Sequence, residues 1–223
     1  MNVTIRRSDY LVQSLLLIFS AAVIWWGCQN GFLSTPATIL LMIFFFIFVY
    51  RNLSAGRRHR QNTRETREHM DTSRRNIIRN MLGFFFGAAA ILIGSRLMVF
   101  GGTSLAQLLG IPERIIGITV VAVGTSIPEL VTTLTAIRKK EHDLSAGNII
   151  GANILDLTLI LPPCSLASGK PLPVAPSAIT FDLPACLLII LIGILPLLIR
   201  EKAGRIQGLL LLASYAAYLV VIL

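Results

Sequence analysis

Long apolar runs recur from end to end of this 223-residue chain, and they restrict the fold more than any other feature. The hydrocarbon core of a bilayer is about 30 Å thick, and a helix of about 20 apolar residues crosses it. Seven runs fit this template: residues 10–28, 32–50, 81–101, 111–137, 146–163, 178–199 and 206–223. We therefore predict an all-α fold, a polytopic transmembrane helical bundle of about seven spans.

Most of the basic residues behind the net charge of +9 lie between these runs, and nine arginines fall within residues 51–80. No aromatic residue separates these arginines, which favours a topology signal over recognition of acidic lipid or RNA. If 51–80 is a cytoplasmic loop, the basic residues other than Arg96, Arg114 and Lys170 share its side of the membrane. The positive-inside rule then predicts a multi-pass protein of the cell membrane with a cytoplasmic N-terminus and no nucleic-acid partner.

Glu129 places a carboxylate in the middle of the fourth apolar run. A charged group is costly at this depth, so it usually faces a cavity or a partner and marks an ion or proton path. Pro128 has no N–H to donate to the Gly124 carbonyl, and its ring crowds that carbonyl, so we expect backbone oxygens to become available there. The alternative interpretation is a simple proline kink beside a hydrogen-bonded Glu129.

Oxygen-bearing groups converge around this carboxylate if the run is helical. Thr125 lies four residues before Glu129 on one helical face, and Ala122 and Ser126 share a neighbouring row. Oxygen ligands suit hard cations such as calcium and sodium, and membrane proteins tolerate broken helices where they line a cavity. We predict a cation site here.

The fifth run carries a second intramembrane carboxylate, Asp156, and Asn153 lies three residues before it. Gly147 and Gly151 form a GxxxG pair, which lets another helix approach closely. We expect that approach to bring Asp156 toward Glu129. The alternative is that the glycine pair serves packing alone.

The two motifs, Gly124-Thr-Ser-Ile-Pro-Glu129 and Gly147-Asn-Ile-Ile-Gly-Ala-Asn-Ile-Leu-Asp156, are joined by a short basic turn. In this combination the chain resembles the sodium/calcium exchangers of the calcium/cation antiporter superfamily, in their prokaryotic form. The resemblance implies two inverted-topology repeats that exchange sodium for calcium by alternating access.

The resemblance also implies residue roles, at the matching positions only. Glu129 matches the principal calcium-binding carboxylate of a repeat, and Thr125 matches a residue whose carbonyl and hydroxyl face the ions. Ser126 and Ala122 match sodium-site positions, and Asp156 matches the polar position of the central site. With Asn153, these residues form the expected set of ion ligands.

Two departures from the family pattern bear on function. Ala152 stands where the family often has serine, which removes one hydroxyl ligand for sodium. The chain also carries one motif pair, which corresponds to the second repeat and to the C-terminal seven of ten helices. We divide it into two preceding helices (1–50), a basic loop (51–80) and the repeat (81–223).

The leading hypothesis is a membrane cation antiporter component that exchanges Ca²⁺ for Na⁺, with H⁺ or K⁺ as further candidate ions and no cofactor. Its expected partner is a separately encoded N-terminal repeat or a second copy of the chain. The alternative is a truncated or non-transporting subunit that keeps the exchanger fold. An enzyme is not expected, because the sequence has no GxGD or HExxH motif.

Overall fold

A computed structural model describes residues 3–4, 7–62, 74–139, 142–200 and 202–222. Within these ranges, seven helices are long and apolar enough to cross a membrane. They cover Tyr10–Gly27, Thr35–Ser54, Ile78–Leu108, Glu113–Arg138, Ser145–Ala167, Ala178–Ile199 and Arg205–Ile222. The predicted all-α class and the predicted number of spans are both confirmed.

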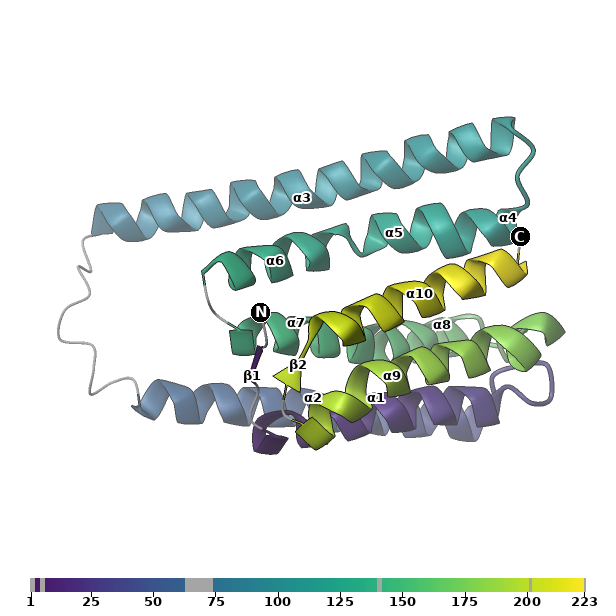
Figure 1. Ribbon diagram of the computed structural model, residues 1–223, viewed down its shortest axis with the longest axis horizontal. Coiled ribbons are helices and arrows are strands. Elements are labelled where there is room, and N and C mark those ends of the chain that lie inside the picture. The colour runs from purple at the N-terminus through teal and green to yellow at the C-terminus, as the bar shows by residue number, and fades with distance from the viewer. Residues whose placement is uncertain (1–2, 5–6, 63–73, 140–141, 201, 223) are drawn as a thin grey trace. The chain divides into compact units, whose positions relative to one another are not determined.

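The helices form two compact units (Figure 1). The larger unit comprises Met1–Ser54 and Lys140–Ile222, and the smaller unit comprises Ala55–Lys139. The larger unit contains α1 (Arg7–Gly27), most of α2 (Thr35–Asn62), α7 (His142–Leu155), η3 (Asp156–Ile160), α8 (Leu161–Ala167), η4 (Ala178–Asp182), α9 (Leu183–Arg200) and α10 (Arg205–Ile222). The smaller unit contains α3 (Arg74–Leu108), α4 (Glu113–Ile116), η2 (Gly117–Val121), α5 (Ala122–Thr125) and α6 (Ile127–Arg138).

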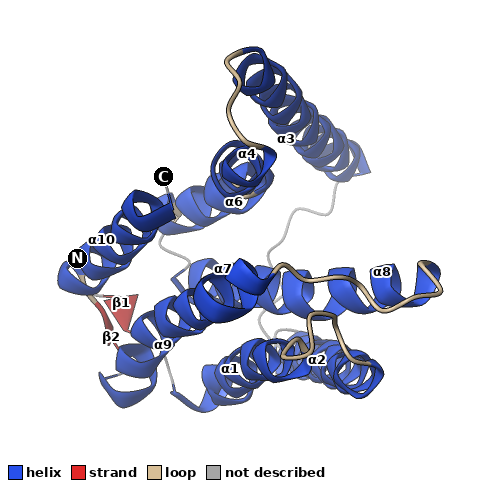
Figure 2. Ribbon diagram, turned by 90° about the vertical axis from the view of Figure 1, so that its right-hand side faces the viewer, coloured by secondary structure: helices blue, strands red, loops and turns tan. Residues whose placement is uncertain are grey.

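Two short strands accompany the helices, β1 (Val3–Thr4) and β2 (Lys202–Ala203), drawn red in Figure 2. They pair antiparallel, with Val3 opposite Ala203 and Thr4 opposite Lys202. The pairing ties the start of the chain to the turn between α9 and α10, since β2 lies in that turn. Strands of two residues carry too little pattern to be predicted from sequence.

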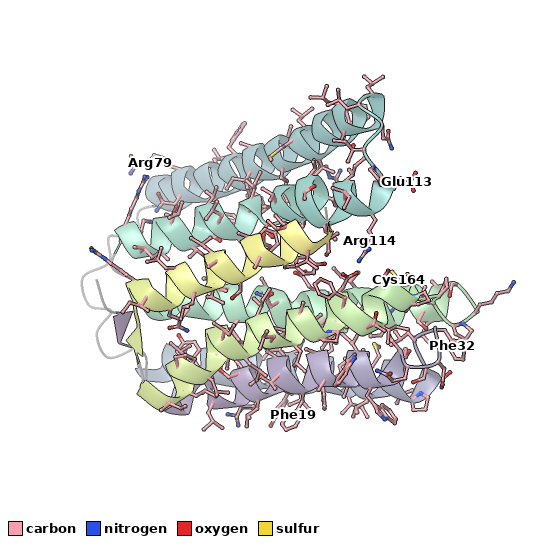
Figure 3. The ribbon with its side chains drawn as sticks, turned by 45° about the vertical axis from the view of Figure 1, so that its right-hand side comes forward. Phe19, Phe32, Arg79, Glu113, Arg114 and Cys164 are labelled. Atoms are coloured by element: carbon pink, nitrogen blue, oxygen red, sulfur yellow. The ribbon has the colours of Figure 1, made fainter. Side chains whose placement is uncertain are left out.

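Helix α1 is central to the larger unit, where it packs against both α7 and α9. One buried cluster draws residues from α1, α2, α7 and α9: Tyr10, Leu16, Leu17, Phe48, Ile150, Ile154, Ile194 and Leu197. By contrast, Phe19 on the outer side of α1 is 54% exposed, as a lipid-facing residue would be (Figure 3). Although we assigned α1 to the helices that precede the repeat, it is therefore part of the packing around α7.

The GxxxG pair of α7 contacts aromatic rings of α1 and α2. A Cβ atom added at Gly147 would lie 3.5 Å from the Tyr10 ring, and one added at Gly151 would lie 3.5 Å from the Phe48 ring. The pair thus provides flat surface for two aromatic side chains within the larger unit. This is the packing role considered above for the pair.

Helix extends into both ends of the 51–80 segment that we expected to be a loop. Helix α2 continues to Asn62, and α3 begins at Arg74. Arginine is a good helix former, so a helix can continue past the membrane edge into water. Residues 63–73 lie outside the described residues.

Small residues allow close helix packing in the smaller unit, where α3 runs beside η2, α5 and α6 (Figure 1). A Cβ atom added at Gly102 would lie 2.5 Å from Cγ1 of Val120, and one added at Gly124 would clash with the Val99 side chain. Between helices in lipid, van der Waals packing replaces the hydrophobic effect as the main attraction. These two glycines therefore set the spacing between α3 and the η2–α5 segment that precedes Glu129.

We expect Gly102→Ala to lower the thermal unfolding midpoint of the purified protein in detergent. Valine is stiff about χ1, so Val120 cannot turn away cheaply, and such overpacking costs about 1–3 kcal/mol. Gly101→Ala is the matched control, because its Cβ atom would meet nothing within 4 Å and alanine is the better helix former. Equal midpoints for the two variants would contradict the close α3–η2 contact.

Candidate ion-binding site

The expected break in the fourth span is present. Helix α5 ends at Thr125, Ser126 has φ −87° and ψ −1°, and α6 begins at Ile127. Pro128 occupies the first turn of α6. Proline fits there because a first-turn N–H has no partner within the helix. Pro128 therefore starts a new helix rather than kinking a continuous one.

The carbonyl groups before the break are less open than we expected. Backbone N–H groups at the helix end donate to the carbonyls of Ala122, Val123 and Gly124. The Thr125 hydroxyl also donates, at 2.9 Å to the Val121 carbonyl and 3.1 Å to the Ala122 carbonyl. The idea that Pro128 releases these oxygens is thus wrong in its simple form, because local donors replace the missing N–H. Each carbonyl still has a second lone pair.

Glu129 lies in the first turn of α6 and is half-buried. Its Oε2 atom is shielded from solvent. Backbone N–H dipoles make the start of a helix positive, which favours a carboxylate there. Thr132, one turn further on, donates its hydroxyl to the backbone carbonyls of Pro128 and Glu129, both at 3.0 Å.

Asn153 and Asp156 lie at the end of α7 and the start of η3, and both are exposed within the larger unit. The Asn153 amide donates through Nδ2 to the Ile149 carbonyl at 2.8 Å. Its Oδ1 atom is therefore the one suited to a cation. Buried Thr158, inside η3, donates to the Ile154 carbonyl at 2.6 Å.

A π-helical segment adjoins each of the two sets of predicted ligands, the set around Glu129 and the set around Asp156. Segment η2 ends directly before Ala122, and η3 begins at Asp156. Single π-helical turns inside α-helices occur frequently at functional sites, because the extra residue changes the direction of the following side chains. Nothing in the local composition predicted either segment.

The structure therefore distributes the six predicted ligands over two units. Ala122, Thr125, Ser126 and Glu129 follow one another on α5 and α6 of the smaller unit. Asn153 and Asp156 are neighbours in the larger unit. Among the described residues, no three His, Cys, Asp or Glu side chains form a metal-binding group.

Sequence reasoning missed a further carboxylate inside a span, Asp182, at the end of η4. The Tyr218 hydroxyl donates to Asp182 Oδ1 at 3.1 Å, and the Tyr218 ring stacks on Phe181 with centroids 5.8 Å apart. One acidic residue hardly changes the mean hydropathy of an 18-residue window, so the hydropathy pattern did not reveal Asp182. Its position inside an apolar run was the available signal.

Charged residues also mark the start of the fourth span. Glu113 and Arg114 open α4, at the end of the smaller unit where the turn from α3 arrives (Figure 3). Both side chains are exposed. Their position at a helix end suits the polar edge of a membrane and distinguishes Glu113 from Glu129, which lies deep in the same span.

Comparison with known proteins shows which family the chain matches. Residues 79–223 match the family described as sodium/calcium exchanger protein. Sodium/calcium exchanger MaX1 of Methanosarcina acetivorans is 41% identical over 134 residues, which are 60% of this chain and 38% of MaX1. Membrane protein MJ0091 of Methanocaldococcus jannaschii is 31% identical over 94% of this chain and 63% of its own length.

Two further matches cover nearly the whole chain. Inner membrane protein YrbG of Escherichia coli is 31% identical over 97% of this chain and 68% of its own length. A structure of the sodium-calcium exchanger NCX_Mj, soaked with Na⁺ and Sr²⁺, matches with a TM-score of 0.68 and 26% identity. That match covers 99% of this chain and 68% of the exchanger. The chain is an integral membrane protein that belongs to the sodium/calcium exchanger family.

Proposed function

We propose that this protein is part of a membrane antiporter that exchanges Ca²⁺ for Na⁺ by alternating access, with Glu129 and Asp156 at the central ion site. The observation that carries the proposal is the position of Glu129. It is a carboxylate within a membrane span, in the first turn of a helix that follows a break at Ser126. Intramembrane carboxylates at broken helices are typical of ion paths in transporters.

The hydrogen bonds around the break make the neighbouring side chains acceptors. Thr125 directs its one hydroxyl proton to the carbonyls of its own helix, so the lone pairs of its oxygen face elsewhere. Asn153 likewise donates its amino group to its own helix. Carboxylate, hydroxyl and amide oxygens are the ligands that calcium and sodium accept.

The proposed ion ligands are Glu129, Thr125, Ser126, Ala122, Asn153 and Asp156. This chain spans 38% of MaX1, 63% of MJ0091 and 68% of the NCX_Mj chain, so these relatives contain further polypeptide beyond the matched part. We therefore propose that a companion repeat completes the site. Such a repeat would come from a further polypeptide segment, a separate chain or a second copy of this one.

The orientation and the coupling ion belong to the same proposal. The basic residues between the spans favour a cytoplasmic N-terminus in the cell membrane. Ala152 lies half-buried in α7 and brings no hydroxyl, so sodium would rely on Thr125 and Ser126 instead. Replacing the driving sodium gradient with a potassium or proton gradient distinguishes the coupling ions.

We expect Glu129→Gln to weaken calcium binding by at least about 100-fold, measured by isothermal titration on protein in detergent. The change keeps side-chain volume and removes the charge, and even losing an outer partner of a metal ligand costs about 10–100-fold. Glu113→Gln is the matched control, an exposed carboxylate at the start of the same span. Unchanged calcium affinity in folded Glu129→Gln would remove Glu129 from the ligand set.

We expect Asp156→Asn to reduce calcium affinity less than Glu129→Gln does, because asparagine keeps an oxygen ligand at the same position. Asp182→Asn serves as the control, since it also neutralises an intramembrane carboxylate of the larger unit. A loss as large as that of Glu129→Gln would make Asp156 a second charged ligand. An equal loss in both aspartate variants would point to general charge instead of a local site.

Transport itself is tested in liposomes that contain the purified chain, by measuring calcium uptake driven by an outward sodium gradient. Uptake that Glu129→Gln lacks and Glu113→Gln keeps would support a working exchanger assembled from this chain. No uptake by the chain, with calcium binding retained, would mean that a companion repeat is required. If the folded chain shows no uptake and binds no calcium, the alternative of a non-transporting subunit is favoured.

A further inference from the structure

Pro196 lies inside α9 and interrupts its ladder of backbone hydrogen bonds. In a regular helix the N–H of residue 196 would donate to the carbonyl of Ile192, four residues earlier. Proline has no N–H, so this bond is absent. In hydrocarbon, where no water replaces it, a carbonyl without a donor destabilises the helix.

Gln207 of α10 donates a side-chain hydrogen bond at this place. Its Nε2 atom lies 3.4 Å from the Ile192 carbonyl oxygen and 2.6 Å from the Gly193 carbonyl oxygen. Two acceptors fix the orientation of the amide, because only its amino group can face them. The shorter bond is to Gly193, and the longer one reaches the Ile192 carbonyl that Pro196 leaves without its helical donor.

The contact lies at one end of a continuous seam between α9 and α10, which run side by side (Figure 1). Leu211, one turn after Gln207, packs against Gly193, where an added Cβ atom would be 3.7 Å away. Tyr218, two turns further, donates to Asp182 near the start of α9 at 3.1 Å. The spacing of four and seven residues places all three side chains on one face of α10.

The break also adjoins the core of the larger unit. Ile194 and Leu197, on either side of Pro196, are buried in one cluster with Ile150 and Ile154 of α7. The direction of α9 at Pro196 therefore influences the packing of α7, which ends where η3 begins.

We infer that Gln207 is a positioning residue, which closes the hydrogen-bond gap at Pro196 and fixes α9 against α10. Proline-broken helices in membranes need such a substitute donor, and here it comes from the neighbouring helix. As a result, α9 and α10 form one stiff pair, and α9 presents Ile194 and Leu197 to α7 at a set angle. The inference stands independently of the proposed ion transport.

A single substitution at Gln207 mixes two effects. The amide also leaves its Oε1 atom buried without a donor among the described residues. Gln207→Met removes the bond to α9 and relieves this unmet acceptor at the same time. The coupling between residues 207 and 196 separates the two effects, because Pro196→Ala restores the N–H that the glutamine replaces.

The experiment compares thermal unfolding midpoints of the full chain in detergent for wild type, Gln207→Met, Pro196→Ala and the double variant. We expect Gln207→Met to lower the midpoint by about 2–4 °C, since interhelical bonds of this kind are modest and a chain of this size shifts by a few degrees. In the Pro196→Ala background the same change should cost about 1 °C or less. Equal losses in the two backgrounds would overturn the inference.

Hydrogen exchange gives a second readout that general destabilisation would not reproduce. Gln207→Met should speed amide exchange in peptides covering residues 190–200, and exchange in residues 10–27 should stay unchanged. Ser214→Ala is the matched control on α10, because the Ser214 hydroxyl donates within its own helix, to Leu210 at 2.7 Å. Faster exchange throughout α1 and α9 alike would contradict a local role at Pro196.

Discussion

The need to satisfy backbone hydrogen bonds without water governs this structure. A bilayer offers no donors or acceptors, so the spans are helical and every departure from a regular helix needs a local substitute. At Ser126 the substitutes are N–H groups at the helix end and the Thr125 hydroxyl. At Pro196 the Gln207 amide donates to the carbonyls of Ile192 and Gly193. At both interruptions of a regular helix, Ser126 and Pro196, a polar side chain therefore donates hydrogen bonds to backbone carbonyls.

Close packing is the second condition, and it links stability to the candidate site. Gly124 belongs to the motif that precedes Glu129, yet its missing side chain also admits Val99 of α3. A methyl group at Gly124 would therefore disturb both the helix break and the contact between helices. In the larger unit, Gly147 and Gly151 have a similar packing role toward Tyr10 and Phe48.

The sequence predicted what depends on local composition. Apolar runs gave the seven spans, and the Gly-Pro pattern gave the break near Ser126. It did not predict the π segments η2 and η3, because their geometry depends on tertiary packing rather than on residue type. The contacts of Tyr10 and Phe48 with α7 were missed for a related reason, since they join residues about 100 or more positions apart. Asp182 was hidden because one acid barely alters an apolar window.

The direction of the polar side chains explains why the site would prefer cations. The Thr125 hydroxyl donates to the Val121 carbonyl at 2.9 Å, and one N–H of the Asn153 amide donates to the Ile149 carbonyl at 2.8 Å, each within its own helix. Their oxygen lone pairs are oriented before any ion arrives, so binding need not reorganise them. Fixed acceptors in a medium of low dielectric attract a cation more strongly than mobile water dipoles do. In the proposed site, the same hydrogen bond that satisfies a carbonyl at the helix break would therefore also orient the Thr125 oxygen toward an ion.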